Sequence, residues 1–185
     1  MPANRRVALS LLAVALLGVA VSACGHTSTT TSTSTSGPTK VAEGEPVTLD
    51  GLQFTITARY LNPHNNQDAA YIAGEPAPSE GLRYAGVYVE VQNEGAEPRP
   101  FPTMLVRDAV GTEHAAFPAT TPYARHFGEV VKPHETQPAL DSTGQGPAKP
   151  SLLLFRLSPA TDKPPLTLHI QSFKEGSEAT VTLDL

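Results

Sequence analysis

The sequence predicts an all-β protein, a sandwich of two antiparallel sheets, and three observations lead to this prediction. Large apolar residues recur at every second position in several short segments, which is the period of a half-buried strand. Turn-forming residues separate these segments. No stretch of helical length carries apolar residues at three- and four-residue spacing. Short alternating strands without helices favour two sheets packed face to face.

The first two strands are predicted within residues 52–60 and 86–95. Each segment directs its large apolar side chains to one face, toward a core, and its polar side chains to the other. The core-facing residues are Leu52, Phe54, Ile56, Ala58 and Tyr60 in the first segment and Val87, Val89 and Val91 in the second. Turn residues at 93–95 end the second strand.

Further strands are predicted in the second half of the chain. Residues 104–108 and 112–117 flank a turn at Val110 and Gly111, and the short hairpin sequence KEGS joins the last two strands. The core-facing residues of the last three strands are Leu153, Phe155 and Leu157, then Leu166, Leu168 and Ile170, then Ala179, Val181, Leu183 and Leu185. About seven or eight strands are expected in total.

The N-terminus has the features of an export signal. Arg5 and Arg6 precede an uncharged, mostly apolar run at residues 7–23. The run is at the short edge of the roughly 20 residues that a membrane-spanning helix needs, and it ends in small residues instead of a basic cluster. We therefore expect residues 1–23 to be a cleaved signal peptide.

The end of this run resembles the lipobox of bacterial lipoproteins. A lipobox reads Leu, then Ala or Ser, then Gly or Ala, then Cys, and this chain has Val21, Ser22, Ala23 and Cys24. The resemblance implies that Cys24 becomes the first mature residue and carries a diacylglycerol, which anchors the protein to the extracytoplasmic side of the cell membrane. The alternative is a buried or free cysteine. An unpaired cysteine in an exported chain needs an explanation, and lipidation supplies one.

Residues 24–43 are expected to be a flexible tether between the lipidated cysteine and the folded domain. The tract TSTTTSTSTSG offers almost no apolar surface to offset the entropy of ordering it. Such tracts also carry O-linked glycans in some exported proteins.

The charge of the mature chain bears on its partners. Beyond the two arginines of the signal segment there are 11 Lys and Arg against 18 Asp and Glu, a net charge of −7. No basic run occurs. Nucleic acid and anionic lipid surfaces are therefore not expected as partners, since binding them depends on clustered positive charge.

Residues 44–185 are expected to form one domain, and four of its segments resemble a known family. GLQFTIT, YAGVYVEVQNEG, FPTMLVRDAVGTEH and PSLLLFRLSP are similar to the immunoglobulin-like domain of many Gram-positive, actinobacterial-type lipoproteins and secreted antigens of unassigned function. The resemblance implies an immunoglobulin-like β-sandwich at the cell envelope, and a fold of this kind does not fix a function. Where members usually have a Pro-Gly turn, this chain has the longer GQGPAKP.

Catalytic motifs are missing from the sequence. A serine hydrolase of the common type needs G-x-S-x-G, and Ser142 lies in a loop without a glycine elbow. Carboxylate pairs such as Glu43 with Glu45, or Glu75 with Glu80, are interpreted as solvated loop charges. No glycine run is suited to cradle a phosphate. We expect no enzymatic activity and no cofactor.

Three histidines are weak candidates for metal ligands. His114, His126 and His134 are 12 and 8 residues apart, without the tight spacing typical of zinc sites. A copper carrier would normally add methionines, and Met104 is the only one after the signal segment. We interpret the three as separate surface histidines and expect no metal.

Two long connections are the candidate recognition surfaces. Loops 61–81 and 118–150 exceed the usual length of a connection, and long loops on a rigid sandwich often carry binding function. The alternative is that both loops are passive. The candidate partner-binding residues within them are Tyr71, Tyr123, His126 and Phe127.

These observations favour a lipid-anchored extracytoplasmic protein that works by binding an envelope protein or an extracellular ligand. The alternative is a metal- or small-molecule-binding accessory lipoprotein associated with a transporter.

Overall fold

The computed structural model describes residues 39–138, 151–158, 165–174 and 176–185. The signal peptide expected at 1–23, Cys24 and most of the tether expected up to residue 43 lie outside these residues. The last part of the connection predicted at 118–150, from residue 139 on, also lies outside them.

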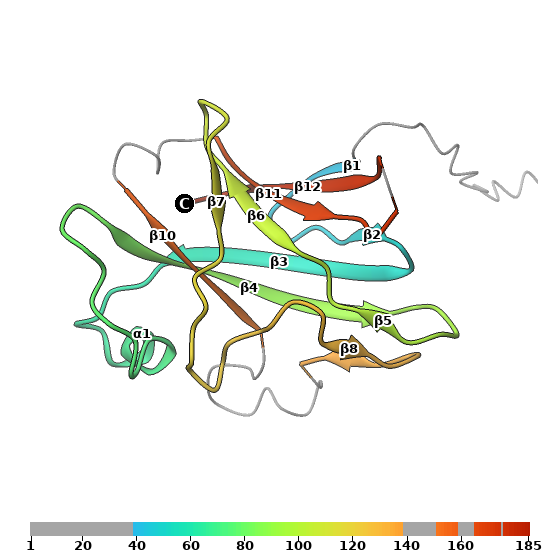
Figure 1. The fold of residues 1–185 in the computed structure, drawn as a ribbon, viewed down its shortest axis with the longest axis horizontal. Coiled ribbons are helices and arrows are strands. Elements are labelled where there is room, and N and C mark those ends of the chain that lie inside the picture. The colour runs from blue at the N-terminus through green and yellow to red at the C-terminus, as the bar shows by residue number, and fades with distance from the viewer. Residues whose placement is uncertain (1–38, 139–150, 159–164, 175) are drawn as a thin grey trace, which may run out of the picture. The chain divides into compact units, whose positions relative to one another are not determined.

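The described residues form a β-sandwich, as the sequence predicts. Figure 1 shows two layers, with β6, β11 and β12 in one and β3 and β4 in the other. The first sheet has the order β1 (Thr39–Ala42), β12 (Glu178–Leu183), β11 (Leu166–Gln171), β6 (Met104–Arg107) and β7 (Glu113–Ala115). The second sheet has the order β10 (Leu152–Leu157), β4 (Arg83–Asn93), β3 (Leu52–Tyr60) and β2 (Val47–Leu49), with β9 (Thr136–Gln137) also paired to β4. A separate ribbon joins β5 (Arg99–Pro100) to β8 (Val130–Val131).

All of these strand pairs are antiparallel except one. β1 runs parallel to β12, with Val41 opposite Val181. β1 lies within the segment expected to be tether, so strand pairing begins before residue 44, where the domain is expected to start.

The main core lies between the two sheets and contains the residues that alternation predicts. Phe54, Ile56, Val87, Val89 and Val91 are completely buried, as the period of two requires. The predicted residues of β11 and β12 lie in the same core. The interpretation of these segments as half-buried strands is confirmed.

β10 differs from this pattern because both of its faces are buried. Leu153 and Phe155 point into the main core, as predicted, while Leu152 and Leu154 belong to a second apolar cluster on the other face of the second sheet. We call this the outer cluster; its buried members are Leu61, Tyr71, Tyr84, Ala119, Ala124, Leu152 and Leu154. Gly86 permits the close packing, because a Cβ at this position would lie only 3.1 Å from Cδ1 of Leu152.

The predicted turn between β6 and β7 is also present. Oδ1 of Asp108 accepts hydrogen bonds from the backbone N–H groups of Val110 and Thr112, at 3.0 and 2.8 Å. Gly111 has a φ of 86°, a backbone conformation that favours glycine.

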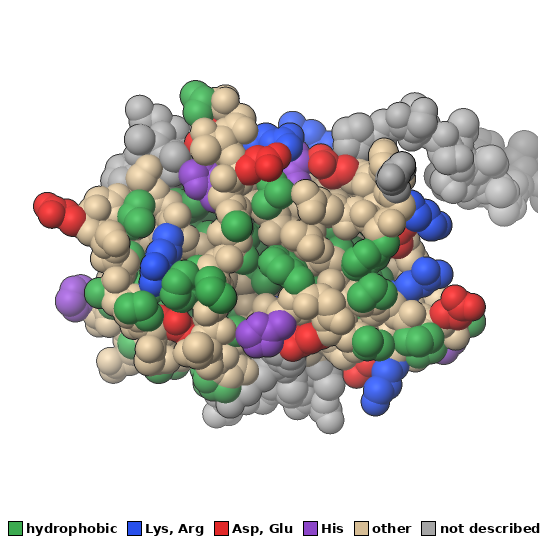
Figure 2. All heavy atoms as spheres, viewed as in Figure 1, with side chains coloured by type: hydrophobic (Ala, Val, Ile, Leu, Met, Phe, Trp, Pro, Cys, Tyr) green, Lys and Arg blue, Asp and Glu red, His purple; other side chains and the backbone are tan. Residues whose placement is uncertain are grey.

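The two long connections contain short regular elements instead of irregular chain alone. α1 (Asn66–Tyr71) lies in the first, and β8 and β9 lie in the second. Figure 1 shows α1 on the side of β3 and β4 that faces away from β6, whereas Val131 of β8 is buried in the main core. Among the described residues, no helix combines the length and the apolar character needed to cross a bilayer. On the face of the molecule shown in Figure 2, acidic, basic and apolar side chains are interspersed.

Candidate ligand pocket

The two long connections are joined to each other over the second sheet. Oε1 of Glu75 accepts hydrogen bonds from the backbone N–H of Thr120 and, at 3.0 Å each, from the Thr120 hydroxyl and the Thr121 N–H. The rings of Tyr71 and Tyr123 also meet edge to face, with centroids 5.2 Å apart. The connections therefore form one structured layer.

Helix α1 fixes the start of the first connection. The side chain of Asn65 caps the helix by accepting a hydrogen bond from the N–H of Gln67. Asp68, which is buried on the helix, accepts a 3.0 Å hydrogen bond from the N–H of Asn62 and pairs with the guanidinium of Arg59 at 2.8 Å. These contacts hold the chain where it leaves β3.

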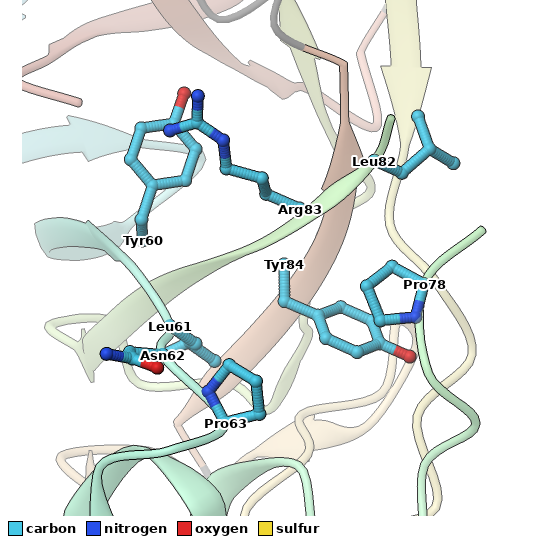
Figure 3. Close-up of a pocket in the computed structure, with 8 residues that line it drawn as sticks. All are labelled: Tyr60, Leu61, Asn62, Pro63, Pro78, Leu82, Arg83 and Tyr84. Carbon is cyan, nitrogen blue, oxygen red and sulfur yellow. The ribbon is translucent and has the colours of Figure 1, made fainter. Parts of the chain in front are cut away.

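A pocket of about 370 Å³ opens where β3 ends and β4 begins (Figure 3). Its volume lies at the lower end of the range for small-molecule sites. Its walls come from the ends of the two strands and from the first connection. The lining residues are Tyr60, Leu61, Asn62, Pro63, Pro78, Leu82, Arg83 and Tyr84.

Tyr84 is the best-fixed wall of this pocket. Its side chain is buried, its hydroxyl donates to the backbone oxygen of Pro76, and it accepts a hydrogen bond from Nη2 of Arg156 at 3.1 Å. The ring also packs beside Phe117, with centroids 6.3 Å apart. Because Tyr84 is held on several sides, binding a ligand against it requires little ordering of the protein.

The other end of the pocket carries a cation. The guanidinium of Arg83 lies over the ring of Tyr60, 5.2 Å from its centroid, and Figure 3 shows the two side chains together. None of the eight lining residues is Ser, Cys, His, Asp or Glu. The pocket thus offers apolar surface, an amide and a guanidinium, which are groups that bind and orient a ligand.

A tyrosine cluster adjoins the outer cluster and contains two of the predicted recognition residues. Tyr71 contacts both Tyr123 and Tyr88, and Arg59 lies over the rings of Tyr71 and Tyr88 at 5.7 and 5.5 Å. Burial raises the pKa of Tyr88 to about 12, against the opposing effect of Arg59. Tyr71 is buried, so it supports the layer rather than presenting a surface. A smaller hollow of about 230 Å³ opens beside this cluster.

The other two predicted recognition residues lie elsewhere in the second connection. Phe127 is 38% exposed and stacks on the buried ring of Phe101, with centroids 6.1 Å apart. His126 is exposed beside it. Neither residue lines the 370 Å³ pocket, so the structure does not unite the four candidates in one site.

The histidines that are candidate metal ligands have separate surroundings. His114 lies on β7, with Nε2 3.4 Å from Oδ2 of Asp108. His134 is exposed, and its backbone N–H donates to the oxygen of Asn93. Within the described ranges, no three His, Cys, Asp or Glu side chains are grouped so that they could hold a metal ion. Thermal unfolding in the presence of zinc tests whether these histidines bind a metal.

Burial acts to raise the pKa of Asp108, but other contacts outweigh it. The backbone N–H of Thr112, the His114 side chain and the N–H of Val110 all stabilise the carboxylate, and the net effect lowers this pKa. The nearest polar partner of His114 is therefore engaged in the turn.

The loop 61–81 predicted as a recognition surface contributes four of the eight lining residues, Leu61, Asn62, Pro63 and Pro78, whereas the four at the strand ends were not predicted as site residues. Tyr84 lies on the face of β4 opposite to the valines that predict this strand, and Arg83 lies at its exposed first position. The prolines of the first connection are a usable signal in the sequence, because Pro63 and Pro78 form rigid walls of the pocket.

Comparison with known proteins gives a likeness of fold. No family model matches the chain, and no curated protein matches it. An uncharacterized β-sandwich protein from Clostridium difficile 630 is similar over 79% of this chain and 94% of its own, with 15% sequence identity and a TM-score of 0.45. The yjhA protein from Bacillus subtilis is similar over 77% of this chain and 98% of its own, with 11% identity and a TM-score of 0.48. At these identities the likeness concerns the β-sandwich fold alone.

Proposed function

We propose that the protein is a lipid-anchored, extracytoplasmic binding module, with the pocket at the ends of β3 and β4 as its ligand site. The observation that carries the binding role is a preformed pocket of about 370 Å³ between the ends of two core strands. A rigid scaffold that presents such a pocket loses little conformational entropy when a ligand enters.

The anchoring part of the proposal comes from the N-terminal sequence. The run at 7–23 and the lipobox-like segment ending in Cys24 support lipidation of this cysteine. Two acyl chains give stable membrane attachment where one gives marginal binding. The resemblance to immunoglobulin-like domains of Gram-positive lipoproteins supports the same location.

The chemistry of the pocket favours binding over catalysis. Nucleophilic catalysis needs a nucleophile within hydrogen-bond reach of a base, and general acid–base catalysis needs a group that titrates near the working pH. Tyrosine, arginine and asparagine line this pocket together with apolar residues. These are not the serine or cysteine of common nucleophilic sites, nor the histidine, aspartate or glutamate of common acid–base sites.

The alternative role, an accessory lipoprotein that binds a small molecule for a transporter, is favoured by one observation. The pocket has the volume of a small-molecule site and is too small to be a whole protein–protein interface. A partner protein would insert a single side chain or a short segment here.

The test is to purify the full-length protein gently from detergent-solubilised membranes and identify co-purifying proteins and small molecules by mass spectrometry. The pocket variant Leu82→Asp is compared with Val110→Asp, which places the same charge on an exposed residue of the β6–β7 turn. We expect at least one species to be lost with Leu82→Asp and kept with Val110→Asp.

Two results would contradict the proposal. If wild type and Leu82→Asp retain the same species in the same amounts, the pocket is not the binding site. If the protein is recovered in the soluble fraction without a lipid on Cys24, the anchoring is refuted.

A further inference from the structure

A second concave site lies on the outer face of the second sheet. It is the smaller hollow, of about 230 Å³, beside the tyrosine cluster. The smaller hollow shares no lining residue with the pocket at the ends of β3 and β4, so what it binds is independent of the proposed ligand site. Its lining residues are Thr55, Thr57, Tyr71, Tyr88, Val89, Glu90, Pro138 and Ser151.

The floor of the smaller hollow is built on two central strands. Thr55 of β3 lies directly opposite Glu90 of β4, and Thr57 lies opposite Tyr88. The period of two that turns the valines of β4 to the core turns these side chains to the outer face. β3 is paired with β2 on one side and β4 on the other, so the floor needs little ordering when a ligand binds.

The polar groups of this floor are not engaged by the protein. Within the part of the chain that the structure describes, the side chains of Thr55, Thr57 and Glu90 have no hydrogen bond or ion pair. Each threonine hydroxyl can donate one hydrogen bond and accept others, and the carboxylate accepts. A ligand that fills the hollow displaces water from these groups and has to replace its hydrogen bonds.

Apolar walls stand beside the polar floor. The rings of Tyr71 and Tyr88 meet edge to face, with centroids 5.0 Å apart, and Pro138 adds a rigid side chain. The volume of the hollow is below the range of about 300–1,000 Å³ that drug-sized ligands occupy. The hollow is therefore suited to a single ring that has both apolar and hydrogen-bonding surface.

The charges around the smaller hollow disfavour an ionic ligand. The carboxylate of Glu90 repels an anion. The guanidinium of Arg59 lies over the rings of Tyr71 and Tyr88, 5.7 and 5.5 Å from their centroids, so a cation that approaches these rings meets a like charge. A neutral ligand avoids both costs.

We infer that the smaller hollow binds one ring of a neutral saccharide. A sugar ring has C–H surface that packs against the tyrosine and proline walls, and hydroxyl groups that both donate and accept hydrogen bonds. Thr55, Thr57 and Glu90 are the partners of these hydroxyls. This inference goes beyond the proposed function, which concerns the other pocket.

The experiment measures ligand binding to the purified full-length protein by saturation-transfer nuclear magnetic resonance, in a detergent without a sugar headgroup. The probes are the methyl glycosides of glucose, galactose, mannose and N-acetylglucosamine. Cyclohexylmethanol has a ring with a single hydroxyl, and glycerol has hydroxyls without a ring. We expect at least one glycoside to bind, and both comparison compounds to bind at least about threefold more weakly, because each lacks one half of the required surface.

Variants assign the binding to the smaller hollow. Thr57→Val keeps the β-branched shape that suits a strand and removes the hydroxyl, and Glu90→Gln removes the charge and one acceptor. Each should weaken glycoside binding about three- to tenfold. The matched control Thr182→Val, on β12 of the first sheet, should leave the affinity unchanged. Thermal denaturation checks that each variant is folded.

The possible results separate this inference from the proposed function. If no glycoside binds, or if Thr57→Val and Glu90→Gln bind it as tightly as the wild type, the inference is overturned. Equal binding of cyclohexylmethanol and the glycoside overturns the recognition of hydroxyl groups. Glycoside binding that is lost in Leu82→Asp but kept in Thr57→Val would assign the sugar to the pocket at the strand ends, which overturns this inference and supports the proposed function.

Discussion

Tyr84→Phe is the sharpest test of how the pocket is held in shape. The substitution keeps the buried ring but removes the hydroxyl that donates to Pro76 and accepts from Arg156. A neutral hydrogen bond contributes about 0.5–1.5 kcal/mol net, and one to a charged group about 1.5–3 kcal/mol. Pro76 is exposed, so water replaces part of the first loss. We therefore expect the free energy of unfolding to fall by about 2 kcal/mol.

The assay is thermal unfolding, with Tyr88→Phe as the matched control. At about 2–4 °C per kcal/mol, Tyr84→Phe should lower Tm by about 4–8 °C. The hydroxyl of Tyr88 accepts a long, exposed hydrogen bond, 3.4 Å from Nε of Arg59, and contacts the Tyr71 side chain, so its removal should lower Tm by only about 2 °C. If the two variants melt within 1 °C of each other, the reasoning that Tyr84 is fixed by its hydroxyl is wrong.

Four other predictions address the anchor, the domain, a titration and the histidines. Cys24→Ala should abolish membrane retention and leave the precursor uncleaved; a variant that is still labelled with lipid would refute the lipoprotein prediction. A fragment that begins at residue 35 and ends at 185 should fold alone, with a far-ultraviolet circular dichroism spectrum dominated by strand, and a helix-rich spectrum would contradict this. Burial raises the pKa of Tyr88 to about 12, so the stability that its protonated phenol contributes is fully present below pH 10 and is lost as the pH rises toward 12. The difference between the ultraviolet titrations of the wild type and of Tyr88→Phe should have its midpoint near pH 12, and a midpoint near pH 10 would contradict this prediction. Zinc should not raise Tm, and a saturable rise that is lost in His126→Ala would instead support the metal-binding alternative.

The fold was predictable because its central strands follow a simple physical rule. Every second side chain is apolar from Leu52 to Tyr60 in β3 and from Ala85 to Val91 in β4, and these side chains are completely or partly buried, so the period of two identifies both the strand and its core face. The turn before β7 was predictable for a similar reason, since Asp108 and Gly111 satisfy its backbone within five residues of chain.

The outer cluster was harder to predict, although the sequence contains a sign of it. Residues 152–155 are apolar without alternation, and such a run indicates a strand buried on both faces. What covers the second face depends on contacts between distant residues, such as those of Glu75 with Thr120 and Thr121. Residues 45 positions apart leave no periodic trace in the sequence.

The same contacts support the proposal that the pocket, and not the tips of the long connections, is the place of recognition. Its walls at residues 60–62 and 82–84 are the ends of two core strands, so the sandwich itself fixes their positions. The intervening chain contributes mainly Pro63 and Pro78, and its course depends on Asp68 and Glu75. The other exposed positions of this connection can therefore vary in sequence without changing the shape of the pocket. Loss of the carboxylate of Asp68 or of Glu75, in contrast, should loosen the outer wall of the pocket.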